Sequence, residues 1–346
     1  MNTTKKTLTI ILSIVLTISL TSSSFAAPSK SLQVHFIDVG QGASQLIISP
    51  SGKTMLIDAG NNDQEDDIVA YLTKQKINKI DVLVGTHPDA DHIGGLDAVI
   101  DNFDIGTIYM PKVQANTETF KDVLLSIQNK SLKVNTAKSG ILIDLDKSLT
   151  VKMIAPVSTY DESNNMSAVI RISYGSTSFL LTGDAEQESE NDIINSKATL
   201  KSDVLLVGHH GSNSSTSQKF LNTVNPKYAV IQVGKNSYGH PTDITLKKLS
   251  SKKITIYRND KQGDIIFTSD GKTINVSTEK TSTTTNKPTT DTKKPSTTTK
   301  TTTTTNTNVT YKNCSEVKAA GKAPLYKGDP GYSTKLDRDK DGVACE

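Results

Sequence analysis

One short run of the chain carries four side chains of types that commonly bind metal ions. Residues 87–92 read His-Pro-Asp-Ala-Asp-His, and the potential ligands are His87, Asp89, Asp91 and His92. Two of the six histidines of the chain lie in this run, and two more are adjacent at His209 and His210. Imidazole and carboxylate groups together suit a divalent transition metal that acts as a Lewis acid. The run therefore predicts a metal site rather than a solvated loop with chance histidines.

The elements around this run decide whether its ligands can converge. The apolar run 81–84 precedes it and predicts a strand, and Pro88 then restricts the turn. Gly94 and Gly95 allow the backbone to approach a neighbouring segment closely. Polar residues also end three other apolar runs, namely Asp58, Asp184 and the pair 209–210. Because a rigid sheet holds the loops at its strand ends, we expect these side chains to lie together.

Short apolar runs alternate with helical patterns through most of the chain. Strands are expected over 34–37, 45–48, 55–57, 81–84, 151–154, 168–173, 178–182, 204–207, 228–233, 253–257 and 264–267. Helices are expected over 66–74, 93–100 and 242–249, and a hairpin through Pro50-Ser51-Gly52. Strands that alternate with helices predict an α/β fold in which helices cover the sheets.

Several segments, taken in order, resemble the motifs of one family. Residues 86–95 (THPDADHIGG) resemble the metal-binding signature of the metallo-β-lactamase superfamily, and Asp as its third residue is similar to the hydrolase domain of ComEC-type competence proteins. The other matching segments are 36–42 (FIDVGQG), 56–60 (LIDAG), 165–167 (NMS), 180–184 (LLTGD), 208–212 (GHHGS) and 238–241 (YGHP). The resemblance spans residues 31–278 and implies an αββα sandwich with two metals at one edge.

The resemblance also implies a role for each polar residue. The ligands of two divalent transition metals, Zn²⁺ or Mn²⁺, would be His87, Asp89, Asp91, His92, Asp184 and one of His209 and His210. Asp58 would orient a ligand through a hydrogen bond, the alternative being a helix N-cap. Asp91 and His240 are expected to act in catalysis. His240 would contact a phosphate or protonate a leaving group, the alternative being a turn histidine before Pro241.

The ligand set implied by the resemblance is rich in oxygen. Asp89 stands where many members of the family have histidine, and no histidine occurs between His92 and His209. Oxygen ligands favour Mn²⁺ over Zn²⁺ more than is usual for this family. The chemistry implied is a hydroxide, activated by two metals, that attacks phosphorus or a carbonyl carbon. No serine nucleophile is needed, and residues 212–217 are expected to form a loop or a helix cap.

The N-terminal part predicts an exported protein. Lys5 and Lys6 precede an apolar run over 8–20, and Ser24-Phe25-Ala26 offers small residues for a cleavage site. We expect a signal peptide over 1–26, the alternative being an uncleaved membrane anchor. No transmembrane segment is expected after cleavage, because no later run is long and apolar enough. The mature protein is expected to be secreted and extracellular, with association with the cell surface or wall as a further expectation.

A Thr-rich segment divides the chain. Sixteen of the 28 residues in 281–308 are Thr and none is apolar, which predicts a disordered linker over 279–308. The following residues 309–346 contain both cysteines, Cys314 and Cys345, which are expected to pair in an exported chain. The pattern Asp-x-Asp-x-Asp-Gly at 337–342 repeats the first half of an EF-hand loop.

These C-terminal residues resemble the Excalibur family, a small extracellular calcium-binding module often found on bacterial surface or secreted nucleases. The expected Ca²⁺ ligands are Asp337, Asp339, Asp341, the carbonyl of Val343 and Glu346. The alternative is an acidic solvated tail. A disulfide closing a loop of about 30 residues would stabilise such a module by about 3–4 kcal/mol.

Three functions are consistent with these features. The first is a secreted nuclease or phosphodiesterase acting on DNA or another phosphodiester, which rests on the resemblance. The net charge of +3 is too balanced to indicate nucleic-acid binding by itself, and with no Trp the chain has no evident platform for stacking nucleobases. The second is a lactamase, an esterase or another small-substrate hydrolase. The third is a calcium-dependent surface-binding protein without catalysis.

Overall fold

The computed structural model describes residues 31–280 and, in the C-terminal part, 310–320, 322, 325–326, 330–336 and 343–345. The chain divides into two units between Thr284 and Thr285, and each unit is described by itself. The expected signal peptide and nearly all of the expected linker lie outside the described residues. Their boundaries therefore remain predictions.

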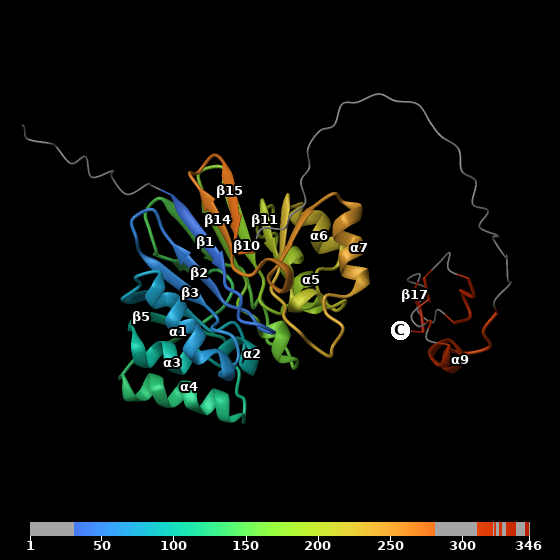
Figure 1. Cartoon of the computed structure of the whole chain (residues 1–346), viewed down its shortest axis with the longest axis horizontal. Helices are drawn as coiled ribbons and strands as arrows, with labels where there is room; N and C mark the ends of the chain where they lie inside the picture. The colour runs from blue at the N-terminus through green and yellow to red at the C-terminus, as the bar shows by residue number, and fades with distance from the viewer. Residues whose placement is uncertain are drawn as a thin grey trace, which may run out of the picture. The chain divides into compact units, whose positions relative to one another are not determined.

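The larger unit contains two mixed β-sheets (Figure 1). The first has the order β15-β14-β1-β2-β3-β4-β5-β6, with β1 Leu32–Phe36, β2 Gln45–Ile48, β3 Thr54–Ile57, β4 Lys79–Val84, β5 Asp104–Met110, β6 Val134–Thr136, β14 Ile265–Ser269 and β15 Ile274–Thr278. The second has the order β13-β12-β11-β10-β9-β8-β7, with β7 Leu142–Ile143, β8 Leu149–Met153, β9 Ile170–Tyr174, β10 Thr177–Leu181, β11 Val204–Leu206, β12 Tyr228–Ile231 and β13 Thr255–Arg258.

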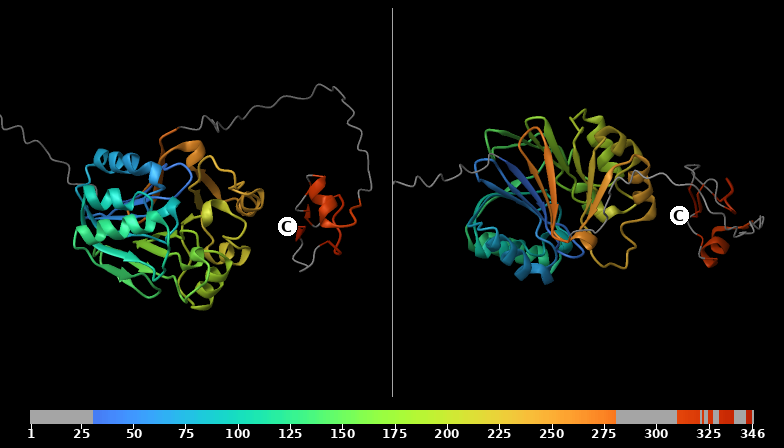
Figure 2. Two further views of the ribbon diagram at one scale, coloured as in Figure 1. Left: turned by 90° about the horizontal axis from the view of Figure 1, so that it is seen from below. Right: turned by 45° about the horizontal axis from the view of Figure 1, so that its top comes forward.

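Helices cover the outer face of each sheet. The α-helices are α1 Glu65–Lys74, α2 Ala90–Ile93, α3 Leu96–Asn102, α4 Glu118–Asn129, α5 Gln187–Asn195, α6 Gln218–Val224, α7 Asp243–Ser251 and α8 Asn259–Gln262. Three short 3₁₀ turns are η1 Asn62–Gln64, η2 Ser163–Met166 and η3 His209–Gly211. Figure 2 shows the two sheets back to back with helices on both outer sides, which confirms the expected αββα sandwich.

Three apolar clusters explain why the layers stay together. One lies between the two sheets and includes Phe36, Phe179 and Phe267. A second joins the first sheet to α1, α3 and α4, and a third joins the second sheet to α5, α6 and α7. Side chains alternate along a strand, so Phe179 of β10 faces the other sheet while Leu180 faces the helices. Strands that are buried on both faces read as continuous apolar runs, which is why the sequence reveals them.

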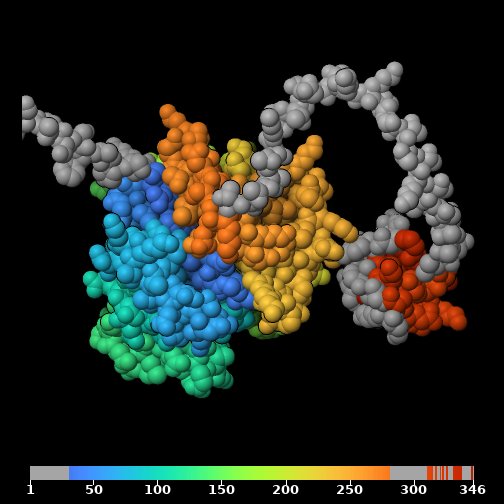
Figure 3. All heavy atoms as spheres, in the orientation of Figure 1, coloured from blue at the N-terminus to red at the C-terminus, as the bar shows by residue number. Residues whose placement is uncertain are grey.

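Most of the expected elements are present, with shifted ends. The hairpin at residues 50–52 joins the antiparallel strands β2 and β3. The expected helix over 93–100 is divided into α2 and α3 at Gly94 and Gly95. Figure 3 shows the C-terminal strands of this unit (orange) against its N-terminal segments (blue), and β14 pairs with β1 on one side and β15 on the other. Segments from the two ends of this unit therefore form part of one sheet.

The smaller unit is held by a disulfide. It contains α9 Cys314–Ala319 and a two-stranded sheet of β16 Leu325–Tyr326 and β17 Val343–Ala344. Cys314 and Cys345 are bonded, as expected, and buried Val317 and Leu336 lie in the same apolar cluster. Of the expected calcium ligands, only the Val343 backbone lies within the described residues.

Candidate metal centre

Strands of both sheets end at the same edge of the sandwich, and the expected metal ligands follow those ends. Asp58 follows β3 and His87 follows β4, which is parallel to β3. Asp184 follows β10, and His209 and His210 follow β11, which is parallel to β10. The sheet edges thus bring together residues that lie far apart in the chain.

The loop after β4 is fixed by close backbone contacts. Asp89 has extended backbone dihedrals and precedes α2, so His92 lies one turn into that short helix. A Cβ atom on Gly94 would collide with the backbone of Asn61 and Asn62. Only glycine therefore lets α2 lie this close to the loop after β3.

His92 is oriented by Asp58, and both side chains are fully buried. His92 Nδ1 donates to Asp58 Oδ2 at 2.7 Å. The same carboxylate accepts bonds from the backbone N–H of Thr86 at 2.8 Å and from its hydroxyl at 2.7 Å. Asp58 does not act as a helix N-cap, because the side chain of Asn61 caps the 3₁₀ turn η1. The alternative considered from the sequence is therefore wrong.

His210 is oriented by a backbone carbonyl in the same manner. His210 Nδ1 donates to the carbonyl of Gln232 at 2.8 Å. The Gln232 side chain donates to the carbonyls of Ile37 and Ser44, so it also ties the two sheets together. A buried glutamine at the end of an apolar strand is the signal in the sequence that could have indicated this position.

His87 completes the buried group. Its Nδ1 lies 3.0 Å from the hydroxyl of Thr86, which donates its own hydrogen to Asp58 and therefore accepts from the imidazole. The Ser167 hydroxyl is 3.4 Å away from the same nitrogen and accepts from the backbone N–H of Asp184 at 3.1 Å. The sequence motifs contained Thr86 and Ser167, but no role was predicted for either.

With Nδ1 protonated in all three rings, each Nε2 is left to bind a cation. The Nε2 atoms of His92 and His210 face each other at 3.2 Å. Asp184 lies between them, with its oxygens 3.2 Å from His92 Nε2 and 3.4 Å from His210 Nε2. The buried Nε2 of His87 has no hydrogen-bond partner among the described residues. Unprotonated imidazole nitrogens and a carboxylate repel one another unless a positive charge lies between them. These residues therefore fit a metal ion.

The potential ligands form two groups of three residues. Within each group, the three ligand atoms lie within 4.8 Å of one another. One consists of His87, His92 and Asp184, and the other of Asp91, His92 and His210. His92 belongs to both groups, so neighbouring positions at this edge could hold a pair of divalent cations. The residue types and the burial match those of a site for a transition metal.

The pKa values show how strongly the cluster favours positive charge. Burial alone would lower the pKa of His210, but Asp184 and Asp91 raise it to about 9. Burial is likewise outweighed at His92, where Asp184 and Asp58 raise the pKa well above its usual value. His87 differs, because burial and the neighbouring His92 lower its pKa to about 4. The charges of Asp184, Asp58 and Asp91 raise the pKa of this ring, but they do not offset burial and the charge of His92.

A model of the metallo-beta-lactamase superfamily matches residues 37–235, which is more than half of the chain. The chain belongs to the metallo-β-lactamase superfamily. A second model, of the Excalibur calcium-binding domain, matches residues 311–346. Both assignments confirm the resemblances seen in the sequence.

Relatives of this superfamily member include competence proteins. ComE operon protein 3 of Bacillus subtilis (strain 168) is 31% identical over 254 residues, which cover 68% of this chain and 33% of the relative. Competence protein ComA of Neisseria gonorrhoeae is 30% identical over 245 residues, which cover 70% and 33%. The chain thus spans about a third of the length of these relatives. The metallo-beta-lactamase fold protein YhfI from Bacillus subtilis is similar in structure, with a TM-score of 0.43, 12% identity and coverage of 65% and 95%.

The described residues contain no helix with the length and apolarity needed to cross a membrane.

The remaining ligands predicted for this metallo-β-lactamase site surround the buried group. Asp91 Oδ2 lies 3.2 Å from His210 Nε2. Asp89 is more exposed and accepts a bond from the Ser163 hydroxyl at 3.1 Å. Of the adjacent histidines, His210 is buried in the centre, whereas His209 is partly exposed. Both have positive φ angles, 49° at His209 and 52° at His210, and this strained turn directs the two rings differently.

His209 lies at the side of the centre. Its Nδ1 is 3.0 Å from Glu186 Oε1, and its Nε2 is 3.8 Å from Asp184 Oδ2. Glu186 was not predicted from the sequence, because nothing in its surroundings marks it. Glu186 thus holds the His209 ring as Asp58 holds His92, but His209 Nε2 lies farther from Asp184 Oδ2 than His210 Nε2, at 3.8 Å against 3.4 Å. His209 is also partly exposed, so His210 is the better placed of the two to bind the metal.

A cleft of about 230 Å³ opens over the centre. Its lining residues are Gln41, Asp89, Asp91, Asp184, His209, His210, Tyr238 and His240. His240 Nδ1 is buried without a hydrogen-bond partner among the described residues. Burial and the neighbouring His209 lower the pKa of His240. The structure therefore brings this predicted catalytic residue to the metal centre.

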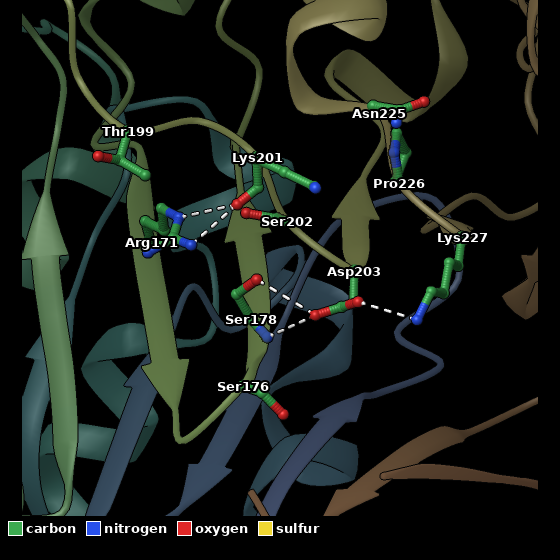
Figure 4. A pocket seen from close by; sticks show the side chains of 10 residues that line it. All are labelled: Arg171, Ser176, Ser178, Thr199, Lys201, Ser202, Asp203, Asn225, Pro226 and Lys227. Atoms are coloured by element: carbon green, nitrogen blue, oxygen red, sulfur yellow. Dashed lines mark hydrogen bonds and ion pairs between the residues drawn. The ribbon is translucent and has the colours of Figure 1, made fainter. Parts of the chain in front are cut away.

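A larger hollow of about 620 Å³ lies elsewhere, where β10, β11 and β12 begin (Figure 4). Asp203 there accepts bonds from Ser178 and pairs with Lys227 at 3.4 Å. Arg171 donates to the carbonyl of Lys201. The lining contains no histidine and a single carboxylate, so it lacks the ligands of the metal centre.

Proposed function

We propose that this protein is a secreted, divalent-metal-dependent phosphodiesterase that hydrolyses DNA. The observation that carries the proposal is the convergence of the His92 and His210 Nε2 atoms on the Asp184 carboxylate, with a ring nitrogen of His87 within 4.8 Å of the His92 and Asp184 ligand atoms. Such a set suits hydrolysis by bound metal, which lowers the pKa of water and stabilises charge on the attacking and leaving oxygens. Two divalent cations, Zn²⁺ or Mn²⁺, are the proposed cofactors.

In this proposal the ligands divide between two positions. His87 and Asp89 would hold one cation, Asp91, His92 and His210 would hold the other, and Asp184 would be available to both. Asp58 and the Gln232 carbonyl hold the imidazoles in place, because each accepts the Nδ1 hydrogen.

His240 is proposed to protonate the leaving oxygen. It lines the cleft beside His209, with the ring centres 5.4 Å apart. Burial lowers its pKa, so the ring is mainly neutral at neutral pH and must first take up a proton, which the protonated ring then donates readily. Asp91 has the complementary property. Burial alone would raise its pKa, but the hydrogen bond from His210 and the charge of His92 lower it to about 2, so it stays ionised.

Two observations support a phosphodiester in DNA over other substrates, and a third concerns the metal. The relatives include a competence protein and a protein named Recombination protein 2 (Haemophilus influenzae), and these names point to the handling of DNA. The cleft of about 230 Å³ is smaller than the roughly 300–1,000 Å³ of pockets that enclose a drug-sized molecule. It therefore suits a small reacting group on a long substrate. Many of its lining groups are oxygen ligands, which suit Mn²⁺.

The proposed location rests on the smaller unit. It has a disulfide between Cys314 and Cys345 and belongs to a calcium-binding domain family. Disulfides persist in oxidising surroundings, and free Ca²⁺ is abundant outside cells, so both features are consistent with an extracellular protein.

The test is cleavage of plasmid and single-stranded DNA by the purified chain with Mn²⁺, Zn²⁺ or Mg²⁺. Activity is expected with Mn²⁺ and should be abolished by His87→Ala. His35→Ala is the matched control, because His35 is also a buried histidine but bonds only Tyr71 and Gln33 among the described residues. DNA left intact with all three metals would overturn the nuclease proposal. Cleavage of chromogenic esters or lactams in the same preparation would then favour a small-substrate hydrolase.

A further inference from the structure

One exposed aromatic side chain stands at the mouth of the metal cleft. Tyr238 lines the cleft together with Asp184 and His210, yet it is 74% exposed. Its hydroxyl makes no hydrogen bond within the described part of the chain, so what the side chain offers is the face of its ring. The composition of the chain gave no evident platform for stacking nucleobases, and the structure supplies a candidate at the site itself.

The loop that carries Tyr238 is held in a fixed shape. The side-chain amide of Asn236 donates to the carbonyls of Gly234 at 3.0 Å and His240 at 2.8 Å. Its oxygen accepts from the backbone N–H of His240 at 3.1 Å. Gly239, with φ of 80°, makes the turn that these bonds require. A ring on such a loop binds a flat partner at a low cost in conformational entropy.

A series of rings leads from the metal centre to Tyr238. The centres of the His209 and His240 rings are 5.4 Å apart, and those of His240 and Tyr238 are 5.9 Å apart. The planes of His240 and Tyr238 differ by only 32°, so the two rings present similar orientations toward the cleft. A phosphate group held at Asp184 would thus share its cleft with the aromatic side chain of Tyr238.

We propose that Tyr238 stacks on a nucleobase next to the phosphate being cleaved. The proposal rests on the proposed phosphodiesterase function and narrows its substrate to nucleic acid with an unpaired base, such as a single strand or a frayed end. In a duplex both faces of each base are covered by neighbouring bases, so only an unstacked base can lie on the tyrosine. Stacking on aromatic side chains tolerates any base, and therefore no sequence specificity is expected.

The kinetic test compares two oligonucleotides of the same length, one with ordinary bases and one made entirely of abasic sites. Tyr238→Ala should lose about 5-fold to about 150-fold more kcat/KM on the base-bearing strand than on the abasic strand. Tyr238→Phe should retain wild-type values, because the ring and not the hydroxyl is used. Leu142→Ala is the matched control, since Leu142 is 67% exposed on β7 and does not line the cleft.

Equal losses on both strands would overturn the proposal, because they would mean that Tyr238 only shapes the loop. A binding measurement separates this from failure of the proposed hydrolysis. The fluorescence of a 2-aminopurine base in an oligonucleotide should be quenched when the wild-type chain binds it in EDTA. The Tyr238→Ala variant should not quench this fluorescence. Quenching without any cleavage would reject the hydrolytic function and keep the stacking site. Cleavage without quenching would reject the stacking site and keep the hydrolytic function.

Discussion

Replacing Asp58 by Asn tests whether the hydrogen bonds behind the metal centre control its affinity. The side chain of Asp58 is fully buried and accepts bonds from His92 Nδ1 and from the N–H and hydroxyl of Thr86. Asparagine has nearly the same shape but presents an N–H₂ group where one oxygen stood. The amide oxygen can keep the bond from the Thr86 N–H, but the amide nitrogen then faces the Nδ1 hydrogen of His92.

The protein can relieve this clash by moving the His92 proton from Nδ1 to Nε2. Nε2 lies 3.2 Å from both Asp184 Oδ1 and His210 Nε2, so the proton would occupy the place of the metal. Changes to groups that orient metal ligands typically reduce affinity by about 10-fold to about 100-fold, which is about 1.4–2.7 kcal/mol. The metal-free protein should also lose about 1.5–3 kcal/mol of unfolding free energy, since a buried hydrogen bond to a charged group is broken.

The assay is a chelator competition with Zn²⁺ or Mn²⁺, together with urea unfolding in EDTA. Asp63→Asn is the matched control, because Asp63 is an exposed carboxylate on η1 whose loss should change neither quantity. If Asp58→Asn bound metal as tightly as the wild type while its stability fell as expected, Asp58 would serve the fold alone. The reasoning about the His92 proton would then be refuted.

Four further outcomes are expected. His210→Ala should remove the cation assigned to Asp91, His92 and His210, so elemental analysis should find about one equivalent of metal less per chain. His209→Ala should retain the metal content of the wild type, because its Nε2 lies farther from Asp184. Equal metal content in both variants would contradict the placement of His210. In the metal-free protein the pKa of His210 is about 9 against its usual 6.5, so protonated His210 adds its full stability below about pH 6.5. This stability is lost as the pH rises through about 9, and urea unfolding in EDTA over that range should show the decline. A free energy of unfolding that rises with pH over this range would contradict the prediction. Calorimetry at about pH 7 in two buffers of different ionisation enthalpy should show that protons are released when metal binds. The absence of proton release would mean that the histidines are already neutral. Changing Cys314 and Cys345 to Ser should destabilise the smaller unit by about 3–4 kcal/mol and make it sensitive to proteolysis. DNA cleavage by the larger unit should persist. Loss of cleavage would show that the activity of the larger unit depends on the smaller one.

Much of the architecture could be predicted from local sequence. Buried strands such as β4 and β10 read as apolar runs because both of their faces are covered. The strongest signal was the cluster of ligand types at residues 87–92, and the structure brings His87 and His92 together with Asp184. The division of the helix expected over 93–100 was missed, since Gly94 and Gly95 matter through contacts with a distant loop.

The sequence by itself determined which chemical groups are available and in what order they follow the strands. The tertiary structure alone decided that His210 rather than His209 lies at the centre, that Thr86 and the Gln232 carbonyl orient the rings, and that Tyr238 stands at the cleft. The physical reason is the separation along the chain over which each signal acts. Apolar periodicity and ligand spacing act over a few residues, whereas His92 and His210 meet across a separation of 118 residues. Such a meeting depends on how two sheets pack, and no local pattern in the chain records it.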